Sequence, residues 1–147
     1  MVKFIRLVIA DNDSDFSGGL QKFLDNQADI KVVDVVRDGQ GAVSRCREAM
    51  PDLVLMDLQL PVLDSIRAIQ AIMAQNERIK VLTTSAVSND RYAVEAVKAG
   101  AYGCIEKNGK DSYELIANAI RQVTKGEVFL NPALASLILK EFHRLTH

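Results

Sequence analysis

Three side chains of this sequence have the types and positions that phosphoryl chemistry requires. Asp11 and Asp57 each directly follow a short apolar segment, and Lys107 lies just after another. The carboxyl group of aspartate ordinarily has a pKa of about 3.9, so it is ionised at neutral pH and can attack phosphorus without a general base. A phosphoryl group is itself anionic, and a bound cation together with a lysine would relieve the repulsion. Ser85, after a further apolar segment, offers a hydroxyl to the same chemistry.

The two aspartates favour a magnesium site over a zinc site. Two carboxylates at 4 Å repel by roughly 4 kcal/mol at an effective dielectric constant near 20, and a resident cation makes such a pair tolerable. Mg²⁺ takes one or two carboxylates plus substrate phosphates, without thiolate or imidazole. Cys46 and Cys104 lie far apart, and both histidines, His143 and His147, are among the last five residues. The sequence therefore excludes a zinc site and a histidine-based triad in the body of the chain.

Two alternating sequence patterns predict the elements that position these side chains. Five short segments rich in Val, Ile and Leu predict buried strands, and each is followed by apolar residues at helical spacing. Such an alternation indicates a parallel sheet with helices on both faces. The predicted strands are 4–10, 31–36, 53–56, 79–83 and 102–105. The apolar faces of the helices that follow them contain Phe16, Leu20, Phe23 and Leu24; Val43, Cys46 and Met50; Ile66, Ile69, Ile72 and Met73; Ala93, Ala96 and Val97; and Leu115, Ile116, Ala119, Ile120 and Val123.

The predicted fold class is α/β, a doubly wound five-stranded parallel sheet of the flavodoxin-like kind. Crossovers between parallel strands are right-handed, and we expect the strand order 2-1-3-4-5. Ligands of such sheets bind beyond the carboxyl ends of the strands, where the strand order reverses, here between the first and third strands. We therefore expect Asp11 and Asp57 side by side at this edge. Asp13 or Ser14 is expected instead to cap the first helix by accepting backbone N–H bonds.

Length and composition exclude several other classes of protein. The chain has 147 residues, of which 48% are hydrophobic and 25% charged, as in one ordinary soluble globular domain. Lys and Arg total 18 against 19 Asp and Glu, and a net charge of −1 excludes a large cationic field for nucleic acid. No apolar run approaches the roughly 18 residues of a membrane span, and the charged start does not fit a signal peptide. Two distant cysteines make a reducing cytoplasmic location the expected one.

After Gly126 the sequence predicts one further helix. Asn131 suits an N-cap, and Pro132 suits the first helical position. An apolar stripe at helical spacing follows, and it is expected to pack on its own domain or cap a neighbour rather than to serve as a dedicated output helix. We thus expect a domain over 1–126 and a C-terminal helix within 127–147, whose stripe contains Leu134, Leu137, Ile138, Phe142 and Leu145.

Nearly the whole sequence resembles the receiver domain of two-component response regulators. The most specific segment is 51–61, Pro-Asp-Leu-Val-Leu-Met-Asp-Leu-Gln-Leu-Pro, which is similar to the third strand with its phosphoacceptor aspartate and following proline. The 46-residue step from Asp11 to Asp57 and the 22-residue step from Ser85 to Lys107 also suit the family. The resemblance covers about residues 4–126 and further rests on 7–11, Asp38-Gly39, 99–103 and Glu106-Lys107, while 29–41 and 127–132 resemble the NarL/LuxR-type branch.

The resemblance implies that Asp57 accepts a phosphoryl group from a phosphohistidine of a sensor histidine kinase. Asp11, Asp57 and the backbone carbonyl of Gln59 would hold Mg²⁺. Lys107 would pair with the phosphoryl oxygens, and Ser85 would swing in to hydrogen-bond them, drawing the loop after the fourth strand inward. This movement would bias the surface of the fourth helix, fifth strand and fifth helix between two states. A doubly charged group with three strong acceptors is a suitable trigger for such a change.

Three residues depart from the family's pattern. Asn12 stands where a second acidic residue is usual, so the metal site has one negative charge fewer, although an amide oxygen can still bind a hard cation. Ser65 stands where glycine is common, which is expected to stiffen the loop beyond the phosphoacceptor. Cys104 occupies the position of the usual switch aromatic, where we expect a small buried hydrophobe rather than a redox sensor, and an altered coupling to the output surface. Thr84 is the second choice for the hydroxyl role.

The resemblance also defines the expected partners. Receiver domains are signalling switches rather than enzymes, although they take part in their own phosphorylation and dephosphorylation. Full-length members of this branch are usually transcription regulators, so we expect output through a helix-turn-helix effector domain that this chain does not contain. The chain itself is expected to contact neither DNA nor a membrane. Self-association is expected, if it occurs, through the output surface or the C-terminal helix.

Two other classes of function stay open at this point. A binding module that keeps the fold but signals without phosphate would account for Asn12 and Cys104. Alternatively, Asp11 and Asp13 look like the Asp-x-Asp signature of haloacid-dehalogenase-type phosphatases, which would make Asp11 the nucleophile and Asp13 a general acid. Flavin binding is disfavoured, because no Ser/Thr/Gly-rich phosphate loop follows the first strand.

Overall fold

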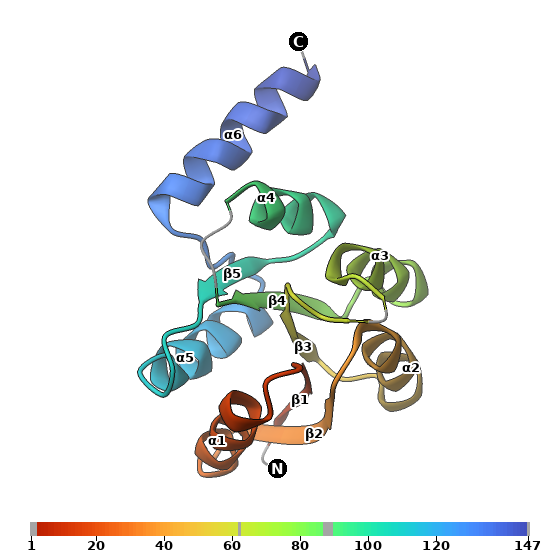
Figure 1. The fold of residues 1–147 in the computed structure, drawn as a ribbon, viewed down its shortest axis with the longest axis vertical. Helices are drawn as coiled ribbons and strands as arrows, with labels where there is room; N and C mark the ends of the chain where they lie inside the picture. The colour runs from red at the N-terminus through yellow and green to blue at the C-terminus, as the bar shows by residue number, and fades with distance from the viewer. Residues whose placement is uncertain (1–2, 62, 87–89, 147) are drawn as a thin grey trace.

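The computed structural model describes residues 3–61, 63–86 and 90–146, and it contains a five-stranded parallel sheet. The strands are β1 (Ile5–Ala10), β2 (Ile30–Val36), β3 (Leu53–Asp57), β4 (Lys80–Ser85) and β5 (Gly103–Glu106). The helices are α1 (Ser14–Asp25), α2 (Gly39–Ala49), α3 (Ser65–Gln75), α4 (Asp90–Ala99), α5 (Tyr113–Thr124) and α6 (Pro132–Thr146). The order β2-β1-β3-β4-β5 confirms the predicted sheet, with α1 and α5 on one face and α2, α3 and α4 on the other (Figure 1).

Each predicted strand is present, with its ends within two residues of the predicted ones. The register brings the ends of the central strands to one edge of the sheet. β1 and β3 are paired as far as Ala10 and Met56, and β3 and β4 as far as Asp57 and Thr84. Asp57 is therefore the last residue of β3, and Asp11 directly follows the last paired residue of β1. The expectation that these two aspartates share the carboxyl edge is confirmed.

The core consists of two apolar layers, one on each face of the sheet, because successive strand residues point to opposite faces. Burying one such aliphatic side chain contributes about 1.5–3 kcal/mol relative to leaving it exposed. Strand residues of the layer under α1 and α5 are Leu7, Ile9, Ile30, Leu53, Leu55, Leu82 and Ile105. Those of the layer under α2, α3 and α4 are Val8, Ala10, Val54, Met56 and Val81.

Short polar side chains begin the helices nearest the carboxyl edge. The Asp13 carboxylate accepts hydrogen bonds from the backbone N–H groups of Asp15 and Phe16, both at 3.1 Å, so it caps α1 as predicted. Asp64 caps α3. Asn131 accepts a bond from the Leu134 N–H at 2.8 Å, and Pro132 begins α6, as its sequence signals indicated. Each cap satisfies backbone donors that the first helical turn cannot pair.

The segment after α5 adds a short contact to the outer edge of β5. The Phe129 N–H donates to the Tyr102 carbonyl at 2.9 Å, and the Cys104 N–H donates to the Phe129 carbonyl at 3.1 Å. Gly103 permits this approach, because a Cβ atom there would lie 2.6 Å from the Phe129 carbonyl oxygen. The sequence did not predict this pairing, which holds the segment between α5 and α6 along the outer edge of β5.

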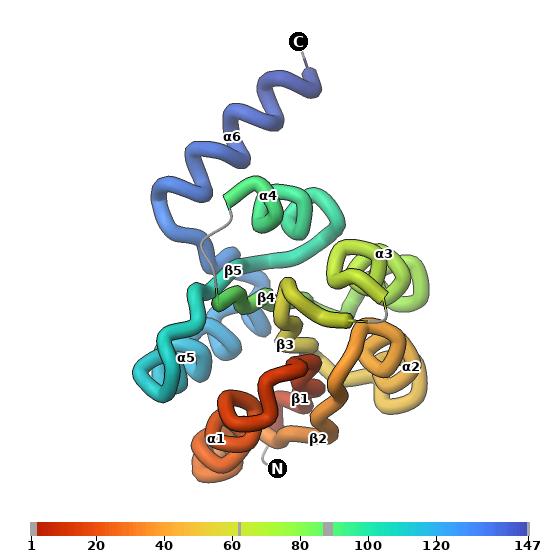
Figure 2. The backbone as a smooth tube through the Cα atoms, viewed as in Figure 1, coloured from red at the N-terminus to blue at the C-terminus, as the bar shows by residue number. Residues whose placement is uncertain are grey.

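Only the first part of the apolar stripe of α6 packs on the domain. Leu134 is 2% exposed and packs with Ala93 and Val94 of α4. Phe142 and Leu145, farther along the helix, are 61% and 59% exposed. Figure 2 shows the C-terminal part of α6 extending past α4 and away from the sheet. The predicted apolar stripe is thus divided, and its first part packs on its own domain as expected.

Within the described ranges, no helix combines the length and the apolar composition that crossing a lipid bilayer would require.

Candidate functional site

Asp11, Asp57 and Lys107 meet at the carboxyl edge of the sheet. The Lys107 Nζ atom lies 2.9 Å from Asp11 Oδ2 and 2.9 Å from Asp57 Oδ2. The three side chains are 3%, 7% and 6% exposed, respectively for Asp11, Asp57 and Lys107, so all of these charges are shielded from water. The two carboxylates come from the ends of adjacent strands and the lysine follows β5. The three residues singled out by type and position therefore form one buried cluster.

The second oxygen of each carboxylate is held by backbone. Asp11 Oδ1 accepts a hydrogen bond from the Asp13 N–H at 2.8 Å. Asp57 Oδ1 accepts one from the Gln59 N–H at 2.9 Å. Each carboxylate is thus oriented by a main-chain donor on one side and by the Lys107 ammonium on the other. Hydrogen bonds of this kind favour the ionised form of a carboxyl group.

Burial and charge act in opposite directions on the pKa values in the pocket. Burial raises the pKa of Asp11, against the lowering effects of the Asp13 N–H and of Lys107, and the nearby Asp57 charge adds to the increase. For Lys107, burial lowers the pKa, but hydrogen bonds and charge from the two carboxylates prevail and raise it above its ordinary value. Two carboxylates therefore face one ammonium, and the pocket favours additional positive charge.

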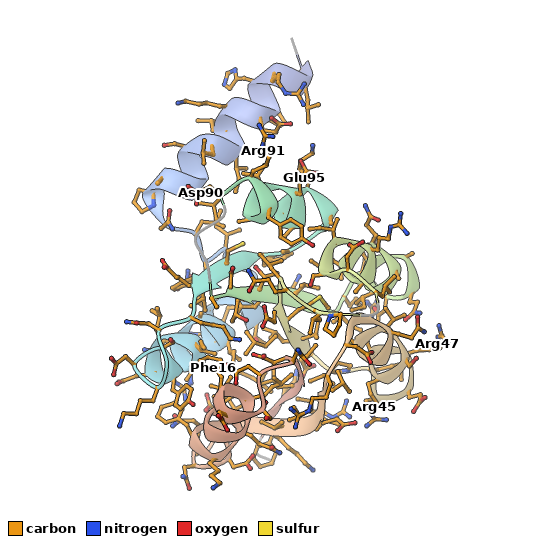
Figure 3. All side chains as sticks on the ribbon, in the orientation of Figure 1. Phe16, Arg45, Arg47, Asp90, Arg91 and Glu95 are labelled. Carbon is orange, nitrogen blue, oxygen red and sulfur yellow. The ribbon has the colours of Figure 1, made fainter. Side chains whose placement is uncertain are left out.

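The Lys107 ammonium lies over the face of an aromatic ring, that of Phe16. Lys107 Nζ lies 4.5 Å from the centre of the Phe16 ring, a distance at which a cation is attracted to the ring face. The Phe16 ring contacts the Tyr113 ring edge-on, and the Tyr113 hydroxyl donates to the Phe16 carbonyl at 3.1 Å. Figure 3 shows Phe16 at the start of α1. The sequence predicted Phe16 only as part of an apolar helix face, since nothing in that pattern signals a contact with a distant lysine.

The donor set at this edge fits Mg²⁺ on chemical grounds. Across residues 3–61, 63–86 and 90–146, no three His, Cys, Asp or Glu side chains are grouped to hold a metal ion. The acidic ligands on hand are the two carboxylates of Asp11 and Asp57, which is the number that Mg²⁺ commonly uses in proteins. Asn12 and Gln59 are exposed beside them. Asp13 caps α1 through one of its carboxylate oxygens, which accepts both backbone hydrogen bonds.

The end of β4 is fixed to both of its neighbours in the sheet. The Leu58 N–H donates to the Thr84 carbonyl at 2.8 Å, and the Lys107 N–H donates to the Ser85 carbonyl at 2.7 Å. Thr84 is buried and in register with Asp57, whereas Ser85 is half-buried at the last position of the strand. Both candidate hydroxyl residues therefore lie on the strand next to the carboxylates.

Cys104 faces α4 rather than the carboxylates. The Thr83 hydroxyl lies 3.0 Å from the Cys104 Sγ atom, and that sulfur lies 4.0 Å from the Ala93 carbonyl. Burial raises the pKa of the Cys104 thiol, so it stays protonated at neutral pH, as a small hydrophobe would. A cavity of about 50 Å³ adjoins it and is lined by Thr83, Ala93 and Leu134, among others. The C-terminal helix thus approaches the position where the family's aromatic is expected.

Ser65 makes a contact that sequence reasoning missed. Its hydroxyl donates to the backbone carbonyl of Asp57 at 2.6 Å, and both residues are buried. The sequence indicated only that a residue larger than glycine follows the Asp57 loop. No local pattern relates a serine at the start of a helix to the strand end eight residues earlier.

Comparisons with known proteins agree with this geometry. The family model of the response regulator receiver domain matches residues 7–120. The transcriptional regulatory protein DegU of Brevibacillus brevis is 29% identical over 143 residues, which cover 97% of this chain and 60% of DegU. The oxygen regulatory protein NreC of Staphylococcus carnosus is 30% identical over 139 residues, which cover 94% of this chain and 63% of NreC. The chain thus spans 60% to 63% of the length of these two relatives.

A solved structure extends the likeness over the C-terminal helix. The crystal structure of a LuxR-family two-component response regulator from Aurantimonas matches with a TM-score of 0.83 at 25% identity, and the match covers 95% of this chain and 98% of that one. The family model alone spans well over half of the sequence. The chain therefore belongs to the response regulator receiver domains, signalling switches of the NarL/LuxR type.

Proposed function

We propose that Asp57 is the phosphoacceptor of this receiver. The observation that carries the proposal is the position of its carboxylate, buried at the carboxyl edge with one oxygen 2.9 Å from Lys107 Nζ, which lies equally close to an Asp11 oxygen. A carboxylate oxygen of Asp57 forms the new bond to phosphorus, while the bond from phosphorus to the donor's histidine nitrogen breaks and the nitrogen keeps the electron pair. Lys107 pairs with the transferred phosphoryl oxygens.

Mg²⁺ is the proposed cofactor. Asp11, Asp57 and the backbone carbonyl of Gln59 would hold it, with the Asn12 amide as a neutral neighbour in place of an acidic one. When bound, the ion neutralises the charge that accumulates as one anion attacks another. The protein's own contribution is to orient the two carboxylates through the Asp13 and Gln59 N–H groups and to exclude water from them.

We propose that phosphorylation is transmitted from β4 to the surface of α4, β5 and α5. Ser85, with Thr84 as the alternative hydroxyl, is the contact to the phosphoryl group, and Cys104 takes the place of the switch aromatic. Two contacts support this path. The Lys107 N–H donates to the Ser85 carbonyl beside the pocket, and the Cys104 thiol contacts the Ala93 carbonyl on α4. We further propose that water then attacks the phosphorus of the aspartyl phosphate, which breaks the bond to the Asp57 oxygen, restores the carboxylate and releases inorganic phosphate.

Response regulators of this type interact with histidine kinases and can dimerise. For this chain we propose a sensor histidine kinase as the donor and a homodimer through α4, β5 and α5 or through α6. The relatives are named transcriptional or oxygen regulatory proteins and are longer than this chain, which supports transcription as the output. In that proposal residues 1–126 are the receiver and 127–147 the linker toward an effector domain, and the cytoplasmic location stays a prediction.

Intact-mass measurement after incubation with acetyl phosphate and Mg²⁺ tests the phosphoacceptor. The wild-type protein should gain the mass of one phosphoryl group, and Asp57→Ala should gain none. Asp25→Ala is the matched control, because Asp25 is an exposed aspartate at the C-terminal end of α1, whereas the pocket lies at the N-terminal end of that helix. A phosphoryl group found on Asp11 would contradict the proposal and support the phosphatase alternative instead.

A second candidate is a receiver that signals without phosphate. The observation that favours it is that Lys107 already pairs with both carboxylates, while Asn12 leaves the pocket with one acid fewer. A Mg²⁺ titration to millimolar concentration, followed by acetyl phosphate, separates the two candidates. The absence of an adduct on the folded wild-type protein would favour this second function.

A further inference from the structure

The loop that follows Asp57 is tied back to Asp57 by a buried side chain. Ser65 is the first residue of α3 and is 0% exposed. Its hydroxyl donates to the backbone carbonyl of Asp57 with an Oγ–O distance of 2.6 Å. A hydroxyl this close to a buried carbonyl makes a strong directional contact, and removing it would leave a buried acceptor to find another donor.

The Asp57 carbonyl lies where strand pairing with β1 has ended. β1 and β3 are in register only as far as Ala10 and Met56, so the main chain of Asp57 lies one residue beyond the last such pair. On its other edge, the end of β3 is still paired with β4, because the Leu58 N–H donates to the Thr84 carbonyl at 2.8 Å. Ser65 thus supplies a bond to the phosphoacceptor residue at the point where the sheet supplies fewer.

The middle of the same loop is held by α2. The Gly39 N–H donates to the Pro61 carbonyl at 3.3 Å. Gly39 also lies so close to the Leu63 carbonyl that a Cβ atom at position 39 would overlap it. The described part of the loop is therefore held by β4 at Leu58, by α2 at Pro61 and by the Ser65 hydroxyl at its end. Between those points lies Gln59, whose N–H holds the Asp57 carboxylate.

We infer that Ser65 is a positioning residue for phosphoryl transfer, an inference that rests on the proposed function of Asp57. Its hydroxyl fixes the main chain of Asp57 and closes the loop so that the Gln59 N–H and carbonyl keep their places beside the carboxylate. A reaction slows steeply when the groups that must meet the reacting atom are no longer held in the productive geometry. Ser65 itself touches neither the carboxylate oxygens nor Lys107 in the contacts described, so it acts through Asp57 and the loop.

The test compares Ser65→Ala and Ser65→Gly with wild type. Both variants lose the hydroxyl, and Ser65→Gly also keeps the test available if the alanine variant does not fold. Ser17→Ala is the matched control, because Ser17 is 1% exposed, lies on α1 and loses the same atom. For each folded protein, the phosphorylation rate is measured against acetyl phosphate concentration and against Mg²⁺ concentration, and the urea midpoint is recorded separately.

We expect both Ser65 variants to show a maximal phosphorylation rate about fivefold to tenfold lower, the effect of one lost buried hydrogen bond, with half-saturation at higher Mg²⁺. Ser17→Ala should keep the wild-type rate and Mg²⁺ dependence. Variants of Ser65 that are less stable yet phosphorylate like wild type would overturn the inference and assign Ser65 a structural role. A wild-type protein that takes up no phosphoryl group would instead overturn the proposed function, so the two failures are distinguishable.

Discussion

Two clusters of lysine and carboxylate in this chain have the same chemistry in opposite surroundings. At the carboxyl edge, Lys107 Nζ lies 2.9 Å from oxygens of both Asp11 and Asp57, with each side chain no more than 7% exposed. Between α4 and α6, Lys98 Nζ lies 3.3 Å from Glu95 and 3.4 Å from Glu141, and the Lys98 side chain is 37% exposed. Figure 3 shows Glu95 on α4 on the side toward α6.

Because the two clusters differ in exposure, their charges have different energetic costs and call for different explanations. Burying charges costs several kcal/mol per ion, which their mutual attraction often fails to recover, so a buried cluster is weak evidence for stability. Exposed pairs lose little hydration and also gain little. The buried cluster is therefore best explained by chemistry that needs those charges, whereas the exposed cluster is an ordinary surface contact beside the apolar contact of Leu134.

Replacing Lys107 by methionine should give the largest effect. Lys107→Met leaves two buried carboxylates without their counter-charge, and we expect the free energy of unfolding at neutral pH to fall by about 3–5 kcal/mol. Urea denaturation measures the change. Lys110→Met, at an exposed lysine nearby, is the control and should lie close to wild type. Equal losses in the two variants would show that the buried cluster is not special.

Removing the Leu134 side chain should have the next largest effect. Leu134 is 2% exposed against α4, and we expect Leu134→Ala to reduce the free energy of unfolding by about 2 kcal/mol, at the low end for a leucine truncation because the site is at the periphery. Amide hydrogen exchange should also become faster over 132–146. Leu139→Ala, at a leucine that is 59% exposed, is the control. Unchanged protection of α6 in the Leu134 variant would mean that other contacts hold the helix.

The pH dependence of Asp11→Asn should have the opposite sign to a normal ion pair. Burial raises the pKa of Asp11 above its ordinary value of 3.8, so the folded state binds the proton more tightly than the unfolded state does. The corresponding stability is present below that ordinary value and is lost as pH rises through the folded pKa. Asp11→Asn lacks this loss and should gain stability relative to wild type as pH rises to neutral. Urea denaturation at several pH values measures it, with exposed Asp25→Asn as control, and a relative loss would contradict the expectation.

Glu141→Gln should have the smallest effect. Hydrogen bonds from Arg144 and Lys98 lower the pKa of Glu141 to about 2, so its contribution is present above pH 4.5 and is lost as pH falls toward 2. The group is at the surface, where water and salt screen the interaction. We expect no resolvable change in the urea midpoint at neutral pH, while an NMR titration should still find the pKa of Glu141 below its ordinary value of 4.5. A large destabilisation would contradict the contrast between the two clusters.

Much of the fold was predictable because its signals are local or follow general topological rules. The strand order and the shared edge of Asp11 and Asp57 follow from alternating strands and helices with right-handed crossovers. The caps at Asp13 and Asn131 follow from residue type just before a helix. The caps required only the residue types next to each helix start. The shared edge of the two aspartates required only the strand order and the place where that order reverses.

The missing parts are contacts between residues that no local pattern connects. The Phe16 ring under Lys107 and the Ser65 hydroxyl on the Asp57 carbonyl depend on how loops place side chains after the sheet has formed. The pairing of Phe129 with β5 depends on a glycine that leaves space for another backbone. The roles of the individual site residues stay predictions, since they concern a reaction rather than a position.

Gly103 has a consequence for solubility. An outer strand presents main-chain donors and acceptors on which strands of other molecules can assemble. Here the backbone of Phe129 occupies part of that rim, and only a residue without Cβ lets it approach. Gly103→Val would displace this cover, and sheet-to-sheet aggregation of otherwise intact molecules is the expected outcome.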